Sequence, residues 1–460
     1  MWLLELNQQS FYKIGGSHNE KNFKKVAALI LVVLLTLSST TLAFASQGEM
    51  TTYPITATNA YTQLNNVETF ESEAEFDAYV NAIIGEGFMQ NQRNALEIIE
   101  QFYNSLALNR SGDAEYPDYF AGFYLDDSGN LVMLVTENQN LAENLMNQDM
   151  TLSSLYESIN IRFVEFSYAE LHEARDAFRI AHEARRELGC VYALNVVGSG
   201  IHRAGNSLRI RLDVYNDRMI EGFRTYVFDS PLIIFEPGVR AELLPEQLPY
   251  EVVSVKNTSI APLNVRVNPG QRISRRAVVL TGSGTMGYRV RRSSDNAEGF
   301  ITSGHVFSSI GQRVYPHYLF ATHLGTVERS EMDNRVDAAF VITHDTPGNT
   351  LPSGFTLGTQ VVQSFWENQV VLMFGATTGA SIGHVLDPDY DTTIEGQFIR
   401  GTVWTNVVSA SGDSGGPVVV IEVLNNIQIG GIVWGGAPNF PDMVFIPAHR
   451  INSDFGVTPF

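Results

Sequence analysis

Three short motifs in the C-terminal half carry a histidine, an aspartate and a serine that together could break an acyl bond. Within the motif ITSGHVF, His305 comes at the end of an apolar strand, Asp337 opens the run DAAFV, and Ser414 lies in the glycine-rich SASGDSGGPVV. A serine hydroxyl needs a base to take its proton, and an imidazole titrates near neutral pH. A carboxylate beside that imidazole orients it and stabilises its cation. We therefore predict a catalytic triad of His305, Asp337 and Ser414.

Glycines on both sides of Ser414 suit the second requirement of this chemistry, which is a donor pair for the oxyanion. Gly412, Gly415 and Gly416 let the backbone bend with no Cβ in the path of a substrate. Two converging amides stabilise the negative charge that develops on the attacked carbonyl oxygen. We predict that the N–H groups of Gly412 and Ser414 form this oxyanion hole.

The segments that must position these residues read as β-structure. Residues 265–460 alternate short β-branched runs with glycine-rich turns, and a helical pattern occurs only near the end. Such a pattern is typical of an all-β barrel or sandwich. The runs include AVVLTG, MGYRV, GFITSG, DAAFVIT, VVLMFG and NIQIGGIVWGG.

The middle of the chain reads as an acidic α+β region. Apolar residues recur at helical spacing in some segments, and two apolar segments flank the turn sequence Asp-Asp-Ser-Gly-Asn. Strands alternating with helices predict small mixed sheets covered by helices on one face. We predict helices over 71–84, 91–108, 168–189 and 219–227, and strands within 119–137, 161–167, 191–202 and 206–214.

No catalytic cluster is evident in this middle region. His172 and His182 are ten residues apart on the predicted helix 168–189, too far apart to share a metal ion. We expect both at the surface. Cys190 follows the helix without an evident partner, so we expect an idle thiol.

The first segment reads as a secretory signal. Lys21, Lys24 and Lys25 precede an apolar run over 26–37, and Ala43-Phe44-Ala45 offers a cleavage site of small residues. The run is short for a membrane span, and the alternative is an uncleaved anchor. We expect residues 1–45 to be removed, leaving a secreted protein with no stable membrane insertion.

Composition excludes several classes of protein. With 44% hydrophobic residues the chain of 460 residues is globular, and a net charge of −20 disfavours nucleic-acid binding. The single Cys190 excludes internal disulfides and a cysteine-rich zinc site. His317, His323 and His449 show no paired-ligand spacing with nearby carboxylates, so we expect neither metal nor cofactor.

The motifs together resemble one enzyme family. The order His, Asp, Ser differs from that of subtilisin and of α/β-hydrolases. Residues 265–460 resemble the chymotrypsin-fold serine proteases, in particular the bacterial secreted branch with α-lytic protease and the Streptomyces griseus proteases. GATTGASIG (375–383), GGIVWGGAPNF (430–440) and VFIPAHRINSDFGV (444–457) resemble further stretches of that branch. The resemblance implies two six-stranded antiparallel barrels.

The resemblance also gives the middle region a role. Members of this branch are made with N-terminal pro-regions that assist folding, so residues 46–264 are expected to be an α+β pro-region. The boundary is expected within 238–268, where prolines are frequent and the last lysine, Lys256, occurs. Residues 265–460 would then be the protease domain.

Two departures from the family pattern stand out. Val306 replaces the usual cysteine after the triad histidine. Asp413 is expected to be buried and to need a cation, because an unpaired buried charge is costly. Met373 occupies the position where the branch usually supplies an arginine. We consider two partners, Arg400 or a new N-terminal amine released by processing.

The resemblance places the substrate pocket at Val408, Ser409, Val433, Trp434 and Gly435. Val408 stands where trypsin-like members carry an acid, so a basic side chain would find no partner there. A small or medium apolar side chain is the expected preference.

We therefore expect a secreted serine endopeptidase, a monomer that acts on protein or peptide substrates and is processed from its own pro-region. Two alternatives remain at this stage. One is a catalytically impaired homologue that binds peptides, and the other is a secreted serine esterase that uses the same triad.

Overall fold

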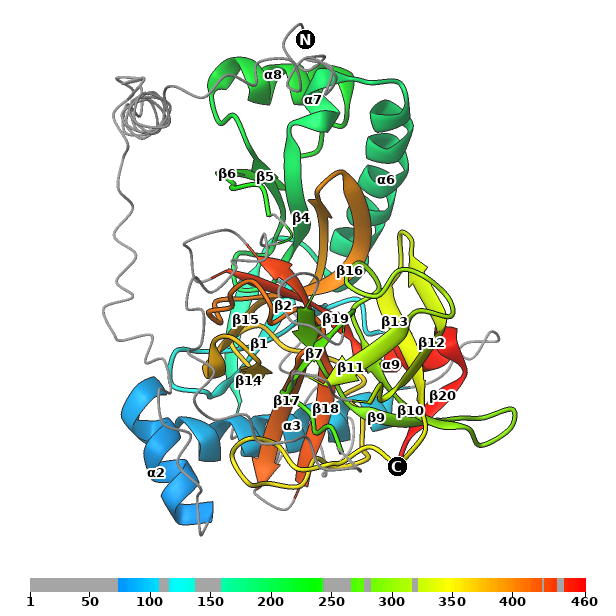
Figure 1. Ribbon diagram of the computed structural model, residues 1–460. Helices are drawn as coiled ribbons and strands as arrows, with labels where there is room; N and C mark the ends of the chain where they lie inside the picture. The colour runs from blue at the N-terminus through cyan, green and yellow to red at the C-terminus, as the bar shows by residue number, and fades with distance from the viewer. Residues whose placement is uncertain are drawn as a thin grey trace, which may run out of the picture. The chain divides into compact units, whose positions relative to one another are not determined.

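Two β-barrels follow one another in the C-terminal half of the chain, and helices with two smaller groups of strands precede them (Figure 1). The computed structural model describes the chain in separate stretches, all within one compact unit that spans Asn59–Phe460. The predicted signal segment 1–45 lies outside the described residues, as does most of the predicted boundary 238–268. The described residues are 73–106, 116–136, 159–241, 243, 266–276, 283–316, 322–423, 426–436 and 442–460.

The first barrel is a sheet that closes on itself. Its strands run in the order β20-β9-β10-β13-β12-β11-β7-β8. Strand β8 lies at one end of this sheet and β9 lies next to the other end. Because β8 and β9 follow each other closely in the chain, the chain connects the two ends of the sheet. The strands are β7 (Arg272–Ser274), β8 (Ser283–Thr285), β9 (Arg289–Arg292), β10 (Glu298–Thr302), β11 (Arg313–Pro316), β12 (Gly325–Met332), β13 (Asp337–Thr343) and β20 (Val457–Pro459).

The second barrel closes through a direct strand pairing. Its order is β14-β17-β18-β19-β16-β15, and β14 pairs back with β15, so six strands form a ring. Helix α9 (Ala448–Phe455) follows its last strand. The strands are β14 (Val370–Gly375), β15 (Gly379–Ile394), β16 (Gln397–Thr405), β17 (Pro417–Val423), β18 (Asn426–Gly436) and β19 (Met443–Pro447).

Alternating side chains fill both barrels. Val418, Val420 and Phe445 point into the second barrel, while Phe300 and Val341 pack inside the first. Such a period of two buries one face of each strand and leaves the other for a second layer of contacts. The predicted all-β, chymotrypsin-like fold of this region is confirmed, although the first barrel consists of eight short strands and not of the expected six.

The N-terminal region has the predicted α+β character. One sheet has the order β1-β2-β3, and β4, β5 and β6 form a second group. The turn at Asp-Asp-Ser-Gly-Asn joins β1 to β2 as predicted, and Asp126 accepts hydrogen bonds from the backbone of Ser128 and Asn130. The elements are α2 (Glu73–Ile84), α3 (Phe88–Ser105), β1 (Phe120–Leu125), β2 (Leu131–Thr136), β3 (Asn160–Val164), α6 (Tyr168–Glu187), α7 (Val191–Leu194), β4 (Val196–His202), β5 (Ser207–Leu212), α8 (Asp217–Tyr226) and β6 (Ile233–Pro237).

Helix α6 corrects the sequence expectation for the two middle histidines. His182 is buried, its Nε2 lies 3.0 Å from the Ala193 carbonyl, and its ring meets Phe398 of β16 edge to face. His172 packs on Tyr168. Burial lowers the pKa of both imidazoles to about 4. Both histidines were expected at the surface, because the sequence alone does not show which other helices and strands pack against α6.

The predicted strand over 191–202 was also partly wrong, because residues 191–194 form the short helix α7 before β4 begins.

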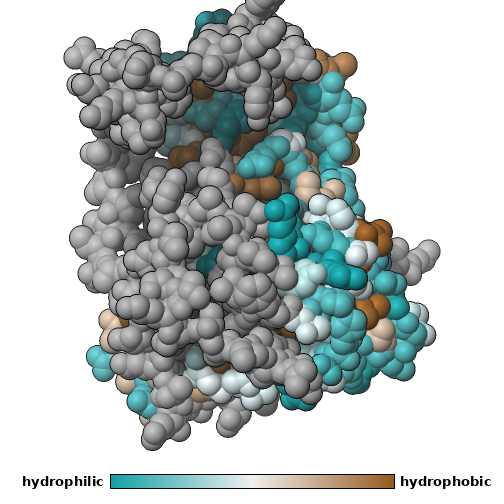
Figure 2. Space-filling view, in the orientation of Figure 1, coloured by the Kyte–Doolittle hydropathy of each residue, from teal (hydrophilic) through white to brown (hydrophobic). Residues whose placement is uncertain are grey.

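The outer surface of the molecule carries both hydrophilic and hydrophobic side chains. In the view of Figure 2 the coloured surface is largely hydrophilic with separate hydrophobic patches, and Ile180, Leu188 and Val191 are among the exposed apolar residues.

Candidate active site

Neighbouring strands bring His305 and Asp337 together. His305 lies just beyond the end of β10, and Asp337 is the first residue of β13, which pairs with β10. The His305 Nδ1 atom lies 2.8 Å from Asp337 Oδ2, and the His305 backbone N–H donates to Asp337 Oδ1 at 2.7 Å. The Asp337 side chain is fully buried, and that of His305 is 11% exposed. A carboxylate held in this way fixes the imidazole with Nδ1 protonated and leaves Nε2 free to accept a proton.

The loop that carries Ser414 packs against the strand that leads to His305. The Ser414 carbonyl accepts a hydrogen bond from Thr285 N–H at 2.9 Å. A Cβ on Gly415 would lie 2.3 Å from Thr302 Oγ1, and a Cβ on Gly284 would lie 3.0 Å from the Ser414 carbonyl. These two glycines therefore allow the serine loop to approach the first barrel this closely. Ser414 itself is half-buried.

Two amides of the serine loop remain available. Asp413, Gly415 and Gly416 each donate their backbone N–H to a carbonyl. Among the described residues the N–H groups of Gly412 and Ser414 have no acceptor. Gly412 has a φ of 95°, a conformation that favours glycine. These are the two amides that the sequence predicted for the oxyanion hole.

The structure corrects the expected partner of Asp413. Its carboxylate accepts hydrogen bonds from the backbone N–H groups of Thr377, Thr378 and Ala410 at 2.7, 3.1 and 2.8 Å, and from the Thr378 hydroxyl. Burial raises the pKa of this carboxyl. Arg400, the cation proposed from sequence, instead pairs with Glu183 of α6.

Amide dipoles and a hydroxyl thus replace the expected cation at Asp413. Thr377 and Thr378 belong to the GATTGASIG stretch, and the Met373 side chain packs in the core of the second barrel. The uncleaved chain already provides these donors. This weakens the hypothesis that a new N-terminal amine is needed as the partner.

The predicted substrate-pocket residues fall into two groups. Val408 and Ser409 are half-buried, and Ser409 Oγ lies 3.3 Å from where a Cβ on Gly436 would be. Val433 and Trp434 are 2% and 1% exposed, so their side chains belong to the packed interior. Gly435 lies between them and Gly436 at the end of β18.

Two buried threonines contribute to the site and were not found in the sequence. Thr285 Oγ1 donates to the Gly412 carbonyl at 2.7 Å and accepts from Ala376 N–H at 3.1 Å. Thr302 Oγ1 donates to the Thr285 carbonyl at 2.8 Å. Threonine is a common strand residue, so neither position gives a signal before the loops are seen in contact.

The group of strands β4–β6 extends the sheet of the second barrel. Strand β4 pairs antiparallel with β15, with Ser199 opposite Asp391 (Figure 1). From α6, Arg179 forms a two-pronged pair with Asp391 at 2.6 Å for both oxygens, and Arg175 pairs with Asp389. Since Asp391 is 2% exposed, these contacts are well shielded from solvent.

Two glycines make this strand pairing possible. A Cβ on Gly198 would lie 1.7 Å from the Tyr390 hydroxyl oxygen, and a Cβ on Gly200 would lie 2.0 Å from Asp387 Oδ2. Both side chains come from β15 and cross beneath β4. The GSG sequence at 198–200 therefore leaves the space that these side chains occupy.

We expect Gly198→Ala to destabilise the full-length chain by about 1–3 kcal/mol, because the added methyl group forces Tyr390 or β4 to move. Thermal unfolding would measure the change. Adding Tyr390→Leu, which removes the clashing hydroxyl and ring, should recover part of the loss in a double-mutant cycle. A Gly198→Ala chain as stable as its parent would show that β4 and β15 do not pack this closely.

The buried Asp387 predicts a pH dependence of stability. Its Oδ1 accepts from Asp389 N–H, whereas Oδ2 has no hydrogen-bond partner among the described residues. Burial raises the pKa of Asp387 to about 8, and Arg209 offsets this only in part. The folded chain therefore holds a proton that the unfolded chain releases near its ordinary pKa of about 4.

We expect the free energy of unfolding to fall as pH rises from about 4 to 8, with a contribution from Asp387 of at most about 1.4 kcal/mol per pH unit. Asp387→Asn keeps the neutral form at every pH, so it should match the parent near pH 4 and exceed its stability at pH 8. Denaturant unfolding of both chains across this range would measure the difference. Parallel curves would contradict the assignment of a buried, protonated carboxyl.

Two family models match the region before the barrels. A Pro-like N-terminal domain matches residues 85–166, and a Pro-like C-terminal domain matches residues 183–238. The first covers α3 and the sheet of β1–β3, and the second covers α7, α8 and β4–β6. These matches agree with the predicted resemblance to a protease that carries an N-terminal pro-region.

A curated relative matches a smaller part of the chain. An uncharacterized protein of Mycobacterium tuberculosis strain H37Rv is 34% identical over 139 residues, which are 29% of this chain and 58% of that protein. A second protein, from Mycobacterium tuberculosis strain CDC 1551, matches to the same extent. The chain thus spans less than two thirds of the length of these curated relatives.

Solved structures of proteases also match. Thermobifida fusca protease A is 26% identical, with a TM-score of 0.36 over 42% of this chain and 98% of that chain. Nocardiopsis protease is 21% identical, with a TM-score of 0.36 over 42% of this chain and 99% of that chain.

Within the described residues, no helix has the length and apolar character needed to cross a membrane.

Proposed function

We propose that the chain is the precursor of a secreted serine endopeptidase. The observation that carries this proposal is the contact of His305 with the fully buried Asp337, beside the glycine-rich loop of Ser414. A buried carboxylate that accepts from Nδ1 suits His305 to act as a general base through Nε2. The sequence GDSGGP around Ser414 supports its role as the nucleophile.

The reaction then follows from these groups. His305 takes the proton of Ser414 as its hydroxyl oxygen attacks the peptide carbonyl carbon. The N–H groups of Gly412 and Ser414 stabilise the oxyanion, which is favoured because both amides are free of other acceptors. His305 returns the proton to the leaving amine, and water completes deacylation by the same route. The residues need no cofactor for these steps.

Residues 46–264 would act as a pro-region that assists folding of the protease domain 265–460 and is removed by a cut within 238–268. The Pro-like matches and the contacts of α6 and β4 with β15 support this role. Residues 1–45 would direct export. The mature protein would be a monomer that acts on protein or peptide substrates outside the cell.

The pocket would favour small or medium apolar side chains. Val408 and Ser409 are accessible in part and carry no charge, which supports this preference. Because the Val433 and Trp434 side chains are buried, their segment would contribute through its backbone and through Gly435.

Covalent labelling tests the proposed function directly. A fluorophosphonate reacts with a serine only where a base and an oxyanion hole activate it. We expect stoichiometric labelling of the processed wild-type protein, with the label on the peptide that contains Ser414, and none in Ser414→Ala. A folded, processed protein that takes up no label would favour the peptide-binding alternative. Substantial kcat/KM for esters together with no measurable hydrolysis of the matched peptides would favour an esterase.

A further inference from the structure

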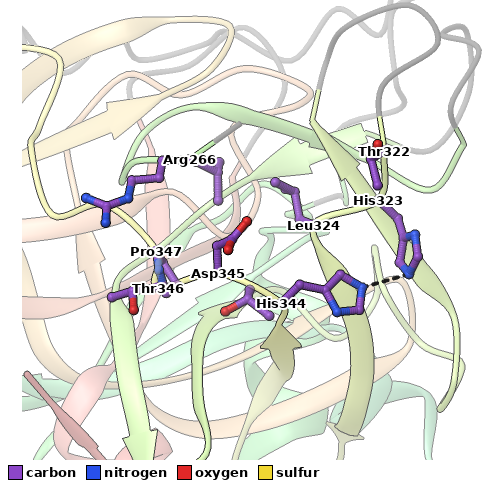
Figure 3. A pocket seen from close by; sticks show the side chains of 10 residues that line it. Arg266, Thr322, His323, Leu324, His344, Asp345, Thr346 and Pro347 are labelled. Atoms are coloured by element: carbon purple, nitrogen blue, oxygen red, sulfur yellow. Dashed lines mark hydrogen bonds between the residues drawn. The ribbon is translucent and has the colours of Figure 1, made fainter. Parts of the chain in front are cut away.

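Two histidines that are distant in sequence meet at one end of the first barrel. His323 precedes β12 and His344 directly follows β13. The strand pair holds the two ends together, with Gly325 opposite Thr343 and His344 N–H donating to the Leu324 carbonyl at 3.0 Å. The two Nε2 atoms form a hydrogen bond of 2.9 Å, in which one ring donates its N–H to the other (Figure 3).

The surroundings leave the pair open to small solutes. His344 is exposed and His323 is half-buried, at the side of a small cavity of about 70 Å³ that Arg266, Asp345 and Thr346 also line (Figure 3). A metal ion bound by both nitrogens would replace the proton that the two rings share in this hydrogen bond, because an imidazole nitrogen must be deprotonated to act as a ligand.

The distance between the two Nε2 atoms fits square-planar or octahedral coordination of a metal ion better than tetrahedral coordination. Imidazole nitrogens lie about 2.0–2.1 Å from a first-row divalent ion. Two such ligands at 90° to each other are about 2.9 Å apart, whereas tetrahedral ligands are about 3.3–3.4 Å apart. The observed 2.9 Å matches adjacent positions of a square-planar or octahedral ion. Nitrogen ligands in this arrangement suit Cu²⁺ and Ni²⁺.

We propose that His323 and His344 form a binding site for a divalent transition-metal ion, Cu²⁺ or Ni²⁺, with the two Nε2 atoms as adjacent ligands and water in the other positions. Among the described residues no cluster of three His, Cys, Asp or Glu side chains could hold a metal, so the site has two protein ligands. No sequence motif indicates this site, because the spacing between the two histidines matches no ligand motif.

A bound ion would cross-link the ends of β12 and β13. Strand β13 begins with Asp337, so the cross-link would stabilise the barrel that holds part of the candidate site. The chain has a single cysteine and cannot form an internal disulfide. The metal would therefore act as a reversible link in this barrel.

The test uses the full-length chain with Ser414→Ala, which stays intact whether or not the chain is a protease. After treatment with a chelator, the protein is titrated with CuCl₂ or NiCl₂ at pH 7.5. We expect one ion to bind per chain. When the free metal concentration is a hundred times Kd, the midpoint temperature of unfolding should rise by about 5 °C. Electron paramagnetic resonance of the Cu²⁺ form should show two equivalent nitrogen ligands.

His323→Ala and His344→Ala should each weaken Cu²⁺ binding by about tenfold or more, because each removes one of two ligands. His449→Ala, at a histidine outside this pair, is the matched control and should bind as the parent does. The metal-free midpoints of all variants check that each is folded. Unchanged Cu²⁺ affinity in both His323→Ala and His344→Ala, or no binding by the parent at pH 7.5, would overturn the proposal.

Discussion

Ser414→Ala is expected to lower kcat for peptide hydrolysis by about a millionfold, because it removes the atom that attacks the carbonyl. The substitution deletes a single oxygen from a loop whose backbone bonds remain. Binding of a peptide substrate should therefore persist. Steady-state kinetics on an apolar peptide substrate would measure the loss in kcat, and a fluorescence titration with the same peptide would measure its affinity.

Ser411 provides a matched control for this prediction. It lies three residues earlier in the same loop, it is half-buried, and among the described residues its hydroxyl has no hydrogen-bond partner. Ser411→Ala should keep kcat within about tenfold of the parent. Comparable losses in the two variants would mean that the loop, and not the Ser414 hydroxyl, limits the reaction.

Asp337→Asn is expected to lower kcat by about ten-thousandfold near neutral pH. The fully buried carboxylate accepts from both His305 Nδ1 and His305 N–H, so it fixes the ring and its tautomer. An amide in this place can donate to Nδ1, which would shift the proton to Nε2 and block the base. Kinetics of the processed enzyme across pH 6–10 would show the loss and its dependence on pH.

Asp333→Asn is the matched control, because Asp333 is exposed and accepts from the turn amides of Arg335 and Val336. Asp333→Asn should leave kcat nearly unchanged and should lower only the free energy of unfolding. If Asp337→Asn kept kcat within tenfold of the parent at pH 7, the buried carboxylate would not be the group that orients His305.

The sequence was most informative where local patterns decide structure. Alternating β-branched residues between glycine-rich turns were enough to predict an all-β barrel or sandwich, because a period of two buries one face of each strand, and the family resemblance then favoured two barrels. The turn between β1 and β2 was predicted from five residues that favour a tight reversal. The triad candidates were found because each motif is short and carries its own chemistry.

Contacts between distant segments could not be predicted in this way. Three of the four donors to Asp413 are backbone amides, those of Thr377, Thr378 and Ala410, and backbone groups leave no signature in side-chain types. The burial of His182 depends on Phe398, more than two hundred residues away. Long-range pairing of β4 with β15 likewise depends on the space left by Gly198 and Gly200, and glycines inside a predicted strand do not show which strand lies against them.

Intact mass and N-terminal sequencing of the exported wild-type protein, beside Ser414→Ala, would test the central proposal most directly. If the chain is a self-processing serine protease, the wild type should yield a fragment that starts within residues 238–268, while Ser414→Ala keeps the residues before it. Incubating purified Ser414→Ala with a trace of processed wild type should then release the same fragment. If both proteins keep the region before residue 238, or if Ser414→Ala is processed as readily as the wild type, the proposal that Ser414 cleaves its own precursor is contradicted.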